Sequence, residues 1–210
     1  MRPSVYTETI ELIVEEYELG NAGRASEVIW WRADGKNFDA VIDRAARAEI
    51  SGKRHPHQRR LKAQAIKDGV AALLAIKDRL QAAPDFLELW FLVQAAFKPI
   101  AGLGELAIYD TADRLRHRLN LVSEHVIFLH AGARVGARRL AGGRLAKESA
   151  WGILRLEVPM GLRHLSTHEI EDILCIYKDE LLLSPQQFLA RRSGVGSPGC
   201  SPVVEARPSC

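Results

Sequence analysis

Apolar residues recur at spacings of three and four along most of the first 190 residues, a period that gives successive α-helices one apolar face each. Alternating apolar and polar residues are too scarce to predict a sheet of three or more strands. We therefore expect a mainly α protein. The pattern predicts helices over residues 4–18, 38–50, 58–81, 86–97, 105–119, 133–145 and 167–182.

Several of these helices carry signals for their ends. Asn37 is an N-cap for the segment that follows it, and Ser166 with Glu169 forms a capping box. A Pro84-Asp85 pair restarts the chain before residue 86, and Lys98-Pro99 ends the next helix. Residues 27–31 are either a short strand or a buried helical turn, because the apolar period does not distinguish the two.

The composition is that of a folded protein. Of the 210 residues, 47% are apolar and 26% are charged, which excludes a disordered, collagen-like or disulfide-scaffold chain. We expect one compact multi-helix domain over residues 1–192. Residues 193–210 are predicted to be a disordered tail, because Gly, Pro and Ser interrupt them every few positions.

Cysteine content and apolar run lengths indicate the compartment. The three cysteines are Cys175, in an apolar stretch, and Cys200 and Cys210 in the tail, so their spacing fits neither a disulfide framework nor a zinc site. The N-terminus lacks the pattern of a signal peptide, and no apolar run approaches the roughly 20 residues that cross a bilayer. We expect a cytoplasmic protein that does not interact with membranes.

Charge is distributed in alternating blocks. The net charge is only +3, but residues 44–79 hold 10 Lys and Arg against 3 Asp and Glu, and residues 114–155 hold 9 against 2. The segments between these blocks are acidic. Charge asymmetry of this kind is a better indicator of an anionic partner than the net charge is. Alternatively, each basic block pairs with an acidic neighbour in the fold.

A Gly-hydrophobe-Gly turn stands between two predicted helices, after the aliphatic Ile100. It consists of Gly102, Leu103 and Gly104, and it allows a tight reversal that leaves backbone N–H groups at a helix N-terminus, where phosphate binds well. These positions resemble the hairpin of helix-hairpin-helix DNA-binding modules, over about 20 of the 210 residues. The resemblance implies contact with a nucleic-acid backbone. A purely structural turn is the alternative.

Two further basic segments are candidates for the same role. Residues 129–140 look like a weaker copy of the hairpin, with an arginine at the second glycine position. Small residues around these arginines fit close helix packing equally well. The other segment, residues 53–62, places positive charge at a helix start, where it opposes the helix dipole and suggests either a bound anion or a frayed end. The candidate phosphate contacts in the two segments are Arg134, Arg138, Arg139, Arg54, Arg59 and Arg60.

Signals for catalysis are few. DNA glycosylases with the helix-hairpin-helix element resemble this chain in size and helical class. In that family the lyase members carry a catalytic lysine on the helix after the hairpin, and an aspartate comes some residues further on. The segment 105–119 contains no lysine, and the following 25 residues contain no aspartate. Asp110 and Asp113 are interpreted as surface or capping carboxylates, with a pairing of Asp113 and His117 left open. No phosphate-binding loop, serine elbow or zinc-protease motif occurs, and we expect no metal or cofactor.

Three hypotheses follow from the sequence. The first is a nucleic-acid-binding protein that contacts the phosphate backbone through the glycine hairpin and the basic blocks. The second is a non-enzymatic interaction or structural protein whose basic blocks pair with acidic partners. The third is a glycosylase-like enzyme. The sequence favours a non-enzymatic role.

Overall fold

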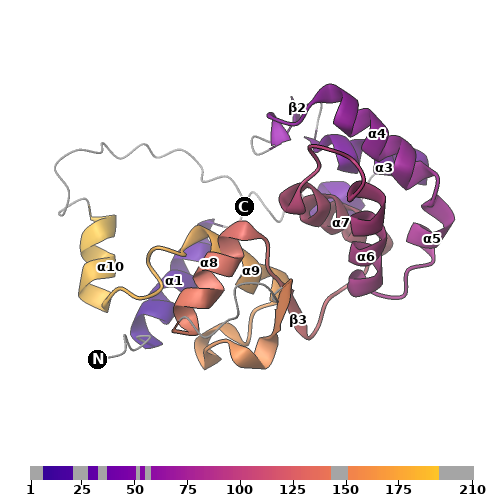
Figure 1. Ribbon diagram of the computed structural model, residues 1–210. Helices are drawn as coiled ribbons and strands as arrows, with labels where there is room; N and C mark the ends of the chain where they lie inside the picture. Colours follow the sequence, from indigo (N-terminus) through magenta and orange to yellow (C-terminus); the bar gives the residue numbers. More distant parts are fainter. Residues whose placement is uncertain are drawn as a thin grey trace. The chain divides into compact units, whose positions relative to one another are not determined.

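The computed structural model describes residues 7–20, 28–32, 37–50, 53–54, 58–142 and 151–193. It is mainly helical, which confirms the predicted fold class. Contacts within the chain define two compact units (Figure 1). Unit 2 is the continuous stretch 23–123, whereas unit 1 combines residues 1–22 with residues 124–210.

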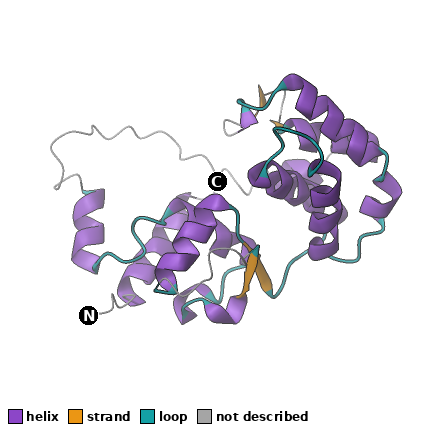
Figure 2. Cartoon of the chain, viewed as in Figure 1, coloured by secondary structure: helices purple, strands orange, loops and turns teal. Residues whose placement is uncertain are grey.

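Unit 2 is a set of helices with one small hairpin (Figure 2). Helix α3 packs against α4 and α7, α4 also packs against α6, and α6 packs against α7. Strands β1 (Glu49–Ile50) and β2 (Lys53–Arg54) pair antiparallel, and residues 28–32 are helical rather than extended. The principal helices are α3 (Phe38–Arg47), α4 (Ala63–Leu74), α5 (Lys77–Gln81), α6 (Phe86–Phe97) and α7 (Glu105–Leu119).

Local capping explains where α3 and α6 begin. The Asn37 side chain accepts a hydrogen bond from the Ala40 N–H at 2.9 Å, and the Asp85 side chain accepts one from the Glu88 N–H at 2.9 Å. Helix α3 ends at Arg47, so its predicted extension to residue 50 is wrong. Ala48 adopts a left-handed conformation with φ 55°, and its N–H bonds back to carbonyls of α3, which terminates the helix before β1.

The predicted helix over residues 58–81 is also wrong in extent. Helix α4 begins only at Ala63, after the cations of residues 59–62, whose charge is unfavourable in a helical first turn. A second difference is the interruption at Ala75 and Ile76, where the Ile76 N–H bonds to the Leu73 carbonyl at 3.1 Å. This bend lets Lys77 Nζ in α5 reach Asp39 Oδ1 of α3 at 3.1 Å, a tertiary contact that helical periodicity does not encode.

Unit 1 buries an apolar core between α1, α8, α9 and a two-stranded sheet. Strands β3 (Val126–Phe128) and β4 (Gly152–Leu154) pair antiparallel, with Ile127 opposite Ile153. Helix α9 packs against both α8 and β3. The remaining elements are α1 (Thr7–Gly20), α8 (Ala131–Leu140), the short 3-10 helices η2 (Arg155–Glu157) and η3 (Met160–Leu162), α9 (Thr167–Ile176) and α10 (Pro185–Arg192).

The helix ends of unit 1 follow the sequence signals in part. The capping box is confirmed, because the Ser166 N–H donates to Glu169 Oε2 at 2.8 Å and the Glu169 N–H donates to Ser166 Oγ at 3.3 Å. Helix α9 nevertheless ends at Ile176, not at residue 182, and α10 follows it. Helix α8 begins two residues before the predicted segment 133–145 and ends at Leu140. Residues 1–6, 143–150 and 194–210, which include the predicted tail after Ser193, lie outside the described residues.

Candidate nucleic-acid interface

The glycine turn joins α6 to α7 as the sequence predicts. Gly102 has φ 101°, a conformation that L residues rarely adopt, so glycine is required there. Gly104 is the N-cap of α7, with φ −89° and ψ −174°, and as a glycine it supplies no side-chain capping hydrogen bond. Because Gly104 has no side chain, an anion can approach the first N–H groups of α7 closely.

The turn is held against helix α4. Leu103 is buried, and a Cβ added to Gly69 of α4 would lie only 2.9 Å from Leu103 Cδ1 and 3.2 Å from the Phe97 ring. A Cβ added to Gly102 would lie 3.7 Å from the Cβ of Ala65. Ala65 belongs to the first turn of α4, so the turn leading into α7 lies beside the start of α4, and Figure 1 shows it arching beside that helix.

The start of α4 also lacks a side-chain cap. Its N-cap is Lys62, whose side chain makes no capping hydrogen bond. Lys62 and the two preceding cations, Arg59 and Arg60, are exposed. The side chains of these three residues make no hydrogen bond or ion pair with any residue that the structure describes. We call this set, Arg59, Arg60 and Lys62, the basic turn.

A buried glutamine anchors the basic turn to α7. Gln58 is 2% exposed, and its Nε2 donates to Asp110 Oδ2 at 2.8 Å. The Leu61 N–H closes the turn by donating to the Gln58 carbonyl at 3.2 Å. The guanidinium groups of Arg59 and Arg60 are thus displayed from a fixed backbone rather than from a frayed helix end.

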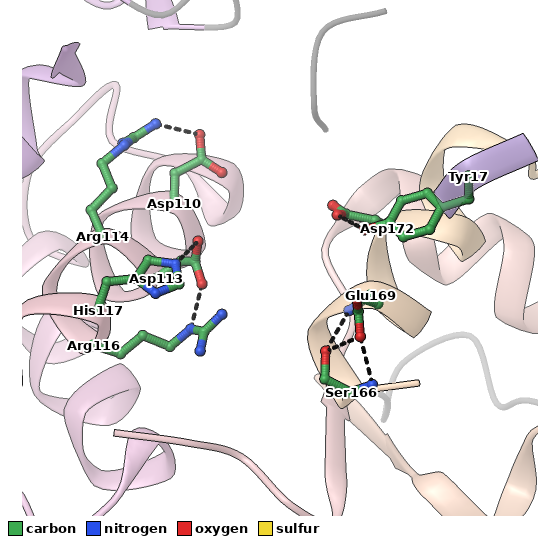
Figure 3. Close-up of polar contacts among 9 residues, drawn as sticks. All are labelled: Tyr17, Asp110, Asp113, Arg114, Arg116, His117, Ser166, Glu169 and Asp172. Atoms are coloured by element: carbon green, nitrogen blue, oxygen red, sulfur yellow. Dashed lines mark hydrogen bonds and ion pairs between the residues drawn. The ribbon is translucent and has the colours of Figure 1, made fainter. Parts of the chain in front are cut away.

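Asp110 is a buried structural carboxylate, which corrects its interpretation as a surface or capping group. Its Oδ2 lies 3.3 Å from Arg114 NH2, and both side chains are 6% exposed (Figure 3). Arg114 NH1 donates to the carbonyl of Ala45 at 3.3 Å, near the end of α3. The Gln58–Asp110–Arg114 chain therefore joins the basic turn, α7 and α3, and Asp110 is engaged in packing rather than chemistry.

Asp113 pairs chiefly with an arginine. Asp113 Oδ1 lies 2.5 Å from Arg116 Nε, whereas Oδ2 lies 3.7 Å from His117 Nε2, beyond hydrogen-bond distance (Figure 3). Burial lowers the pKa of Arg116, but the charge and hydrogen bond of Asp113 outweigh it, so the pKa is raised above its ordinary value. Asp113 therefore lies near both Arg116 and His117, but its contact with His117 is the longer and weaker of these two contacts.

Arg54 is placed differently from the basic turn. It is the last residue of β2, is half-buried and faces Glu49 in the strand register. Its Nε is buried without a hydrogen-bond partner among the described residues. The structure therefore separates Arg54 from the exposed arginines with which the sequence grouped it.

The arginines of the second predicted segment lie in unit 1, on α8. Arg134 NH2 donates to the Leu129 carbonyl at 2.8 Å, and Arg138 is half-buried. Arg139 NH1 donates to the Lys178 carbonyl and lies 2.6 Å from Asp179 Oδ1. The hydrogen bond from Arg139 to the Asp179 carboxylate lowers the pKa of Asp179 below its ordinary value. Arg134 and Arg139 are thus bound to acceptors of their own unit.

Helix α8 packs through its small residues. Ala133, Gly136 and Ala137 are its buried positions, and a Cβ added to Gly136 would overlap the carbonyl oxygen of Leu174 in α9. This close approach of two helix backbones explains why glycine and alanine alternate with arginine along residues 131–139. Of the two readings that the sequence left open for this segment, the contacts on the described residues favour packing.

Unit 1 also contains buried polar pairs that the sequence analysis missed. His130 caps α8, with Nδ1 accepting from the Gly132 N–H at 3.3 Å, and its Nε2 lies 2.5 Å from Glu171 Oε1. The Tyr17 hydroxyl donates to Asp172 Oδ2 at 2.7 Å (Figure 3). The signal was available, since Glu171 and Asp172 stand among the apolar positions of α9. The described residues include no group of three or more His, Cys, Asp and Glu that could hold a metal ion.

Comparison of the chain with protein-family models, with curated proteins and with solved structures found no match in any of the three. Within the described part of the chain, every helix is too short or too polar to cross a membrane.

Proposed function

We propose that unit 2 binds nucleic acid through the phosphate backbone, using the glycine turn and the basic turn together. The observation that carries the proposal is the position of Gly102, where an added Cβ would lie 3.7 Å from the Cβ of Ala65. The turn before α7 therefore lies beside the start of α4, and neither N-cap residue makes a side-chain capping hydrogen bond. Two helix N-termini and the cations of the basic turn supply N–H donors and positive charge to one region. The likeness of the turn to helix-hairpin-helix modules supports the same function.

The distribution of charge between the units supports this assignment. Residues 23–123 hold 17 Lys and Arg against 12 Asp and Glu, a net charge of +5, whereas the remainder of the chain holds 12 against 14, a net charge of −2. The positive field that attracts a polyanion therefore originates in unit 2. Backbone contacts of this kind position a protein on nucleic acid without specifying a base sequence.

The test is binding of labelled duplex DNA and duplex RNA across a salt series that starts near 50 mM, followed by fluorescence anisotropy. We expect log affinity to fall linearly with log salt. Replacing both Arg60 and Lys62 with Gln should reduce that slope by about two, because each lost phosphate contact removes about one unit. The proposal fails if the unaltered protein does not bind either duplex near 50 mM salt.

Gly104 offers a sharper test of the turn itself. No atom lies within 4 Å of a Cβ added there, so Gly104→Val leaves the fold intact but places a branched side chain at the start of α7. Losing a charge-assisted hydrogen bond costs about 1.5–3 kcal/mol, so we expect at least roughly tenfold weaker binding. Gly20→Val is the matched control, because Gly20 in unit 1 has equally open surroundings. Equal affinity of the two valine variants would exclude the turn from the interface.

Two charge controls complete the design. Arg79 in α5 is exposed, its side chain makes no hydrogen bond or ion pair with the described residues, and in the chain it comes after the C-terminal end of α4. Arg134 is bonded within unit 1. We expect Arg79→Gln and Arg134→Gln to leave the salt slope unchanged. If either control lowered the salt slope by about one unit, as expected for the loss of one contact of the basic turn, the attraction would be diffuse and would not come from a defined surface.

A further inference from the structure

Residues 155–163 of unit 1 form a compact loop that is closed by its own arginines. Arg155 donates from Nε and NH2 to the carbonyl of Arg163, at 2.9 and 2.5 Å. Arg163 in turn donates from Nε to the Val158 carbonyl at 2.9 Å and from NH2 to the Leu156 carbonyl at 2.6 Å. Four hydrogen bonds thus hold nine residues in one conformation, so a partner would not have to order the loop on binding. We call it the arginine-closed loop.

This rigid loop and the strand before it expose large apolar side chains. Leu156 is 73% exposed and Met160 is 80% exposed, and Trp151 and Leu154 are also on the surface. Single exposed apolar residues are ordinary, but these four lie within ten consecutive residues, two of them on the closed loop itself. The Leu156 carbonyl accepts from the Arg163 guanidinium, and the Met160 carbonyl accepts from the Arg163 N–H at 3.0 Å.

The charges beside these side chains select the partner. Residues 151–163 contain two guanidinium groups, those of Arg155 and Arg163, which donate only to carbonyls among the described residues. They contain one carboxylate, Glu157, whose Oε2 accepts from the Leu154 N–H at 2.6 Å. We propose that the arginine-closed loop docks an acidic amphipathic segment of another protein, with apolar side chains against Leu156 and Met160 and carboxylates near the guanidinium groups.

Two other occupants fit less well. Helix α1 packs against η3, and its exposed face carries Glu8, Glu11 and Glu15, which would repel an anionic lipid surface lying across the loop. A second copy of the chain in a two-fold contact would place two copies of the same basic patch opposite each other. A discrete acidic segment can reach the guanidinium groups without covering α1.

The test uses two short fluorescein-labelled peptides with leucines at helical spacing, one with glutamate and the other with lysine at the remaining positions. We expect the full-length protein to raise the anisotropy of the glutamate peptide and to bind the lysine peptide at least roughly tenfold more weakly. The double variant Leu156→Ser with Met160→Ser should weaken binding of the glutamate peptide about tenfold or more. Leu19→Ser is the control, since Leu19 in α1 is also 80% exposed.

The outcomes are separable. Both serine variants replace exposed side chains, so circular dichroism should match that of the unaltered protein. Equal binding of the two peptides, or equal binding by the double variant and the Leu19 variant, would refute the proposal. So would sedimentation of the protein with phosphatidylserine vesicles that depends on Leu156 and Met160, or self-association that the double variant abolishes. None of these measurements depends on nucleic-acid binding by unit 2.

Discussion

Adjacent arginines occur both on α8, at Arg138 and Arg139, and in the basic turn, at Arg59 and Arg60, but the two clusters have different surroundings. On α8, small residues bury one face against α9, and Arg134 and Arg139 reach acceptors within unit 1. Directly before the basic turn, Gln58 is buried, whereas Arg59 and Arg60 are exposed. An arginine cluster is therefore no evidence for an anionic partner until the acceptors that its own unit supplies are known.

The largest effect that we expect concerns the packing of α8. Gly136→Val places a branched side chain on the Leu174 carbonyl, where α8 and α9 cannot separate without opening the core of unit 1. We expect the free energy of unfolding to fall by more than about 4 kcal/mol, measured by chemical denaturation. Gly20→Val serves again as the control, with little change in stability. If Gly136→Val changed the free energy of unfolding only slightly, close packing would not explain this segment, and the arginines of α8 would again be candidate phosphate contacts.

The next effect concerns the anchor of the basic turn. Asp110→Ala leaves the guanidinium of Arg114 buried without its carboxylate and removes the acceptor of Gln58. Breaking a buried ion pair from one side costs about 3 kcal/mol or more, which chemical denaturation would measure.

Asp68→Ala is the matched control for this substitution. Asp68 accepts a hydrogen bond from Gln64 on the exposed face of α4, and we expect a change within about 0.5 kcal/mol. If Asp110→Ala were equally mild, the basic turn would not depend on the buried chain of Gln58, Asp110 and Arg114, and its contrast with α8 would lose its structural basis.

Sequence patterns predicted helices well where the signal is local. Helix α7 has the predicted bounds, α6 begins after Asp85 and ends before Lys98, and the capping box of α9 is present. Helix α10 could also have been predicted, because Ser184, Pro185 and Gln187 form the same kind of start. The interruption of α4 at Ala75 and the pairing of β3 with β4 depend on distant contacts, and local patterns do not contain them.

The candidate site was predictable to the same extent. The need for glycine at position 102 follows from the turn alone, and the structure has φ 101° there. The fate of each arginine did not follow, because the acceptors of Arg139 lie about 40 residues away, at Lys178 and Asp179. The division into two units is likewise invisible to periodicity, since unit 1 unites residues 1–22 with residues from 124 onward.

The smallest effect tests one ion pair of unit 1 directly. The hydrogen bond from Arg139 lowers the pKa of the Asp179 carboxyl, so the folded state favours its charged form. The stabilisation is present above the pKa that Asp179 has in the unfolded chain, and it is lost as pH falls through the lower pKa of the folded state. We expect Arg139→Gln to raise the pKa of Asp179 towards its ordinary value, as measured by a carbon-13 NMR titration of the carboxyl group.

Arg191→Gln provides the control for this titration. Arg191 acts on the Asp179 carboxyl through charge alone and is the smallest of the contributions that lower its pKa, so its removal should raise that pKa less than Arg139→Gln does. The same pKa in the unaltered protein and in Arg139→Gln would mean that Arg139 does not hold Asp179 in solution. Arg139 would then keep only its hydrogen bond to the Lys178 carbonyl among the described residues, and the contrast between α8 and the basic turn would be weaker.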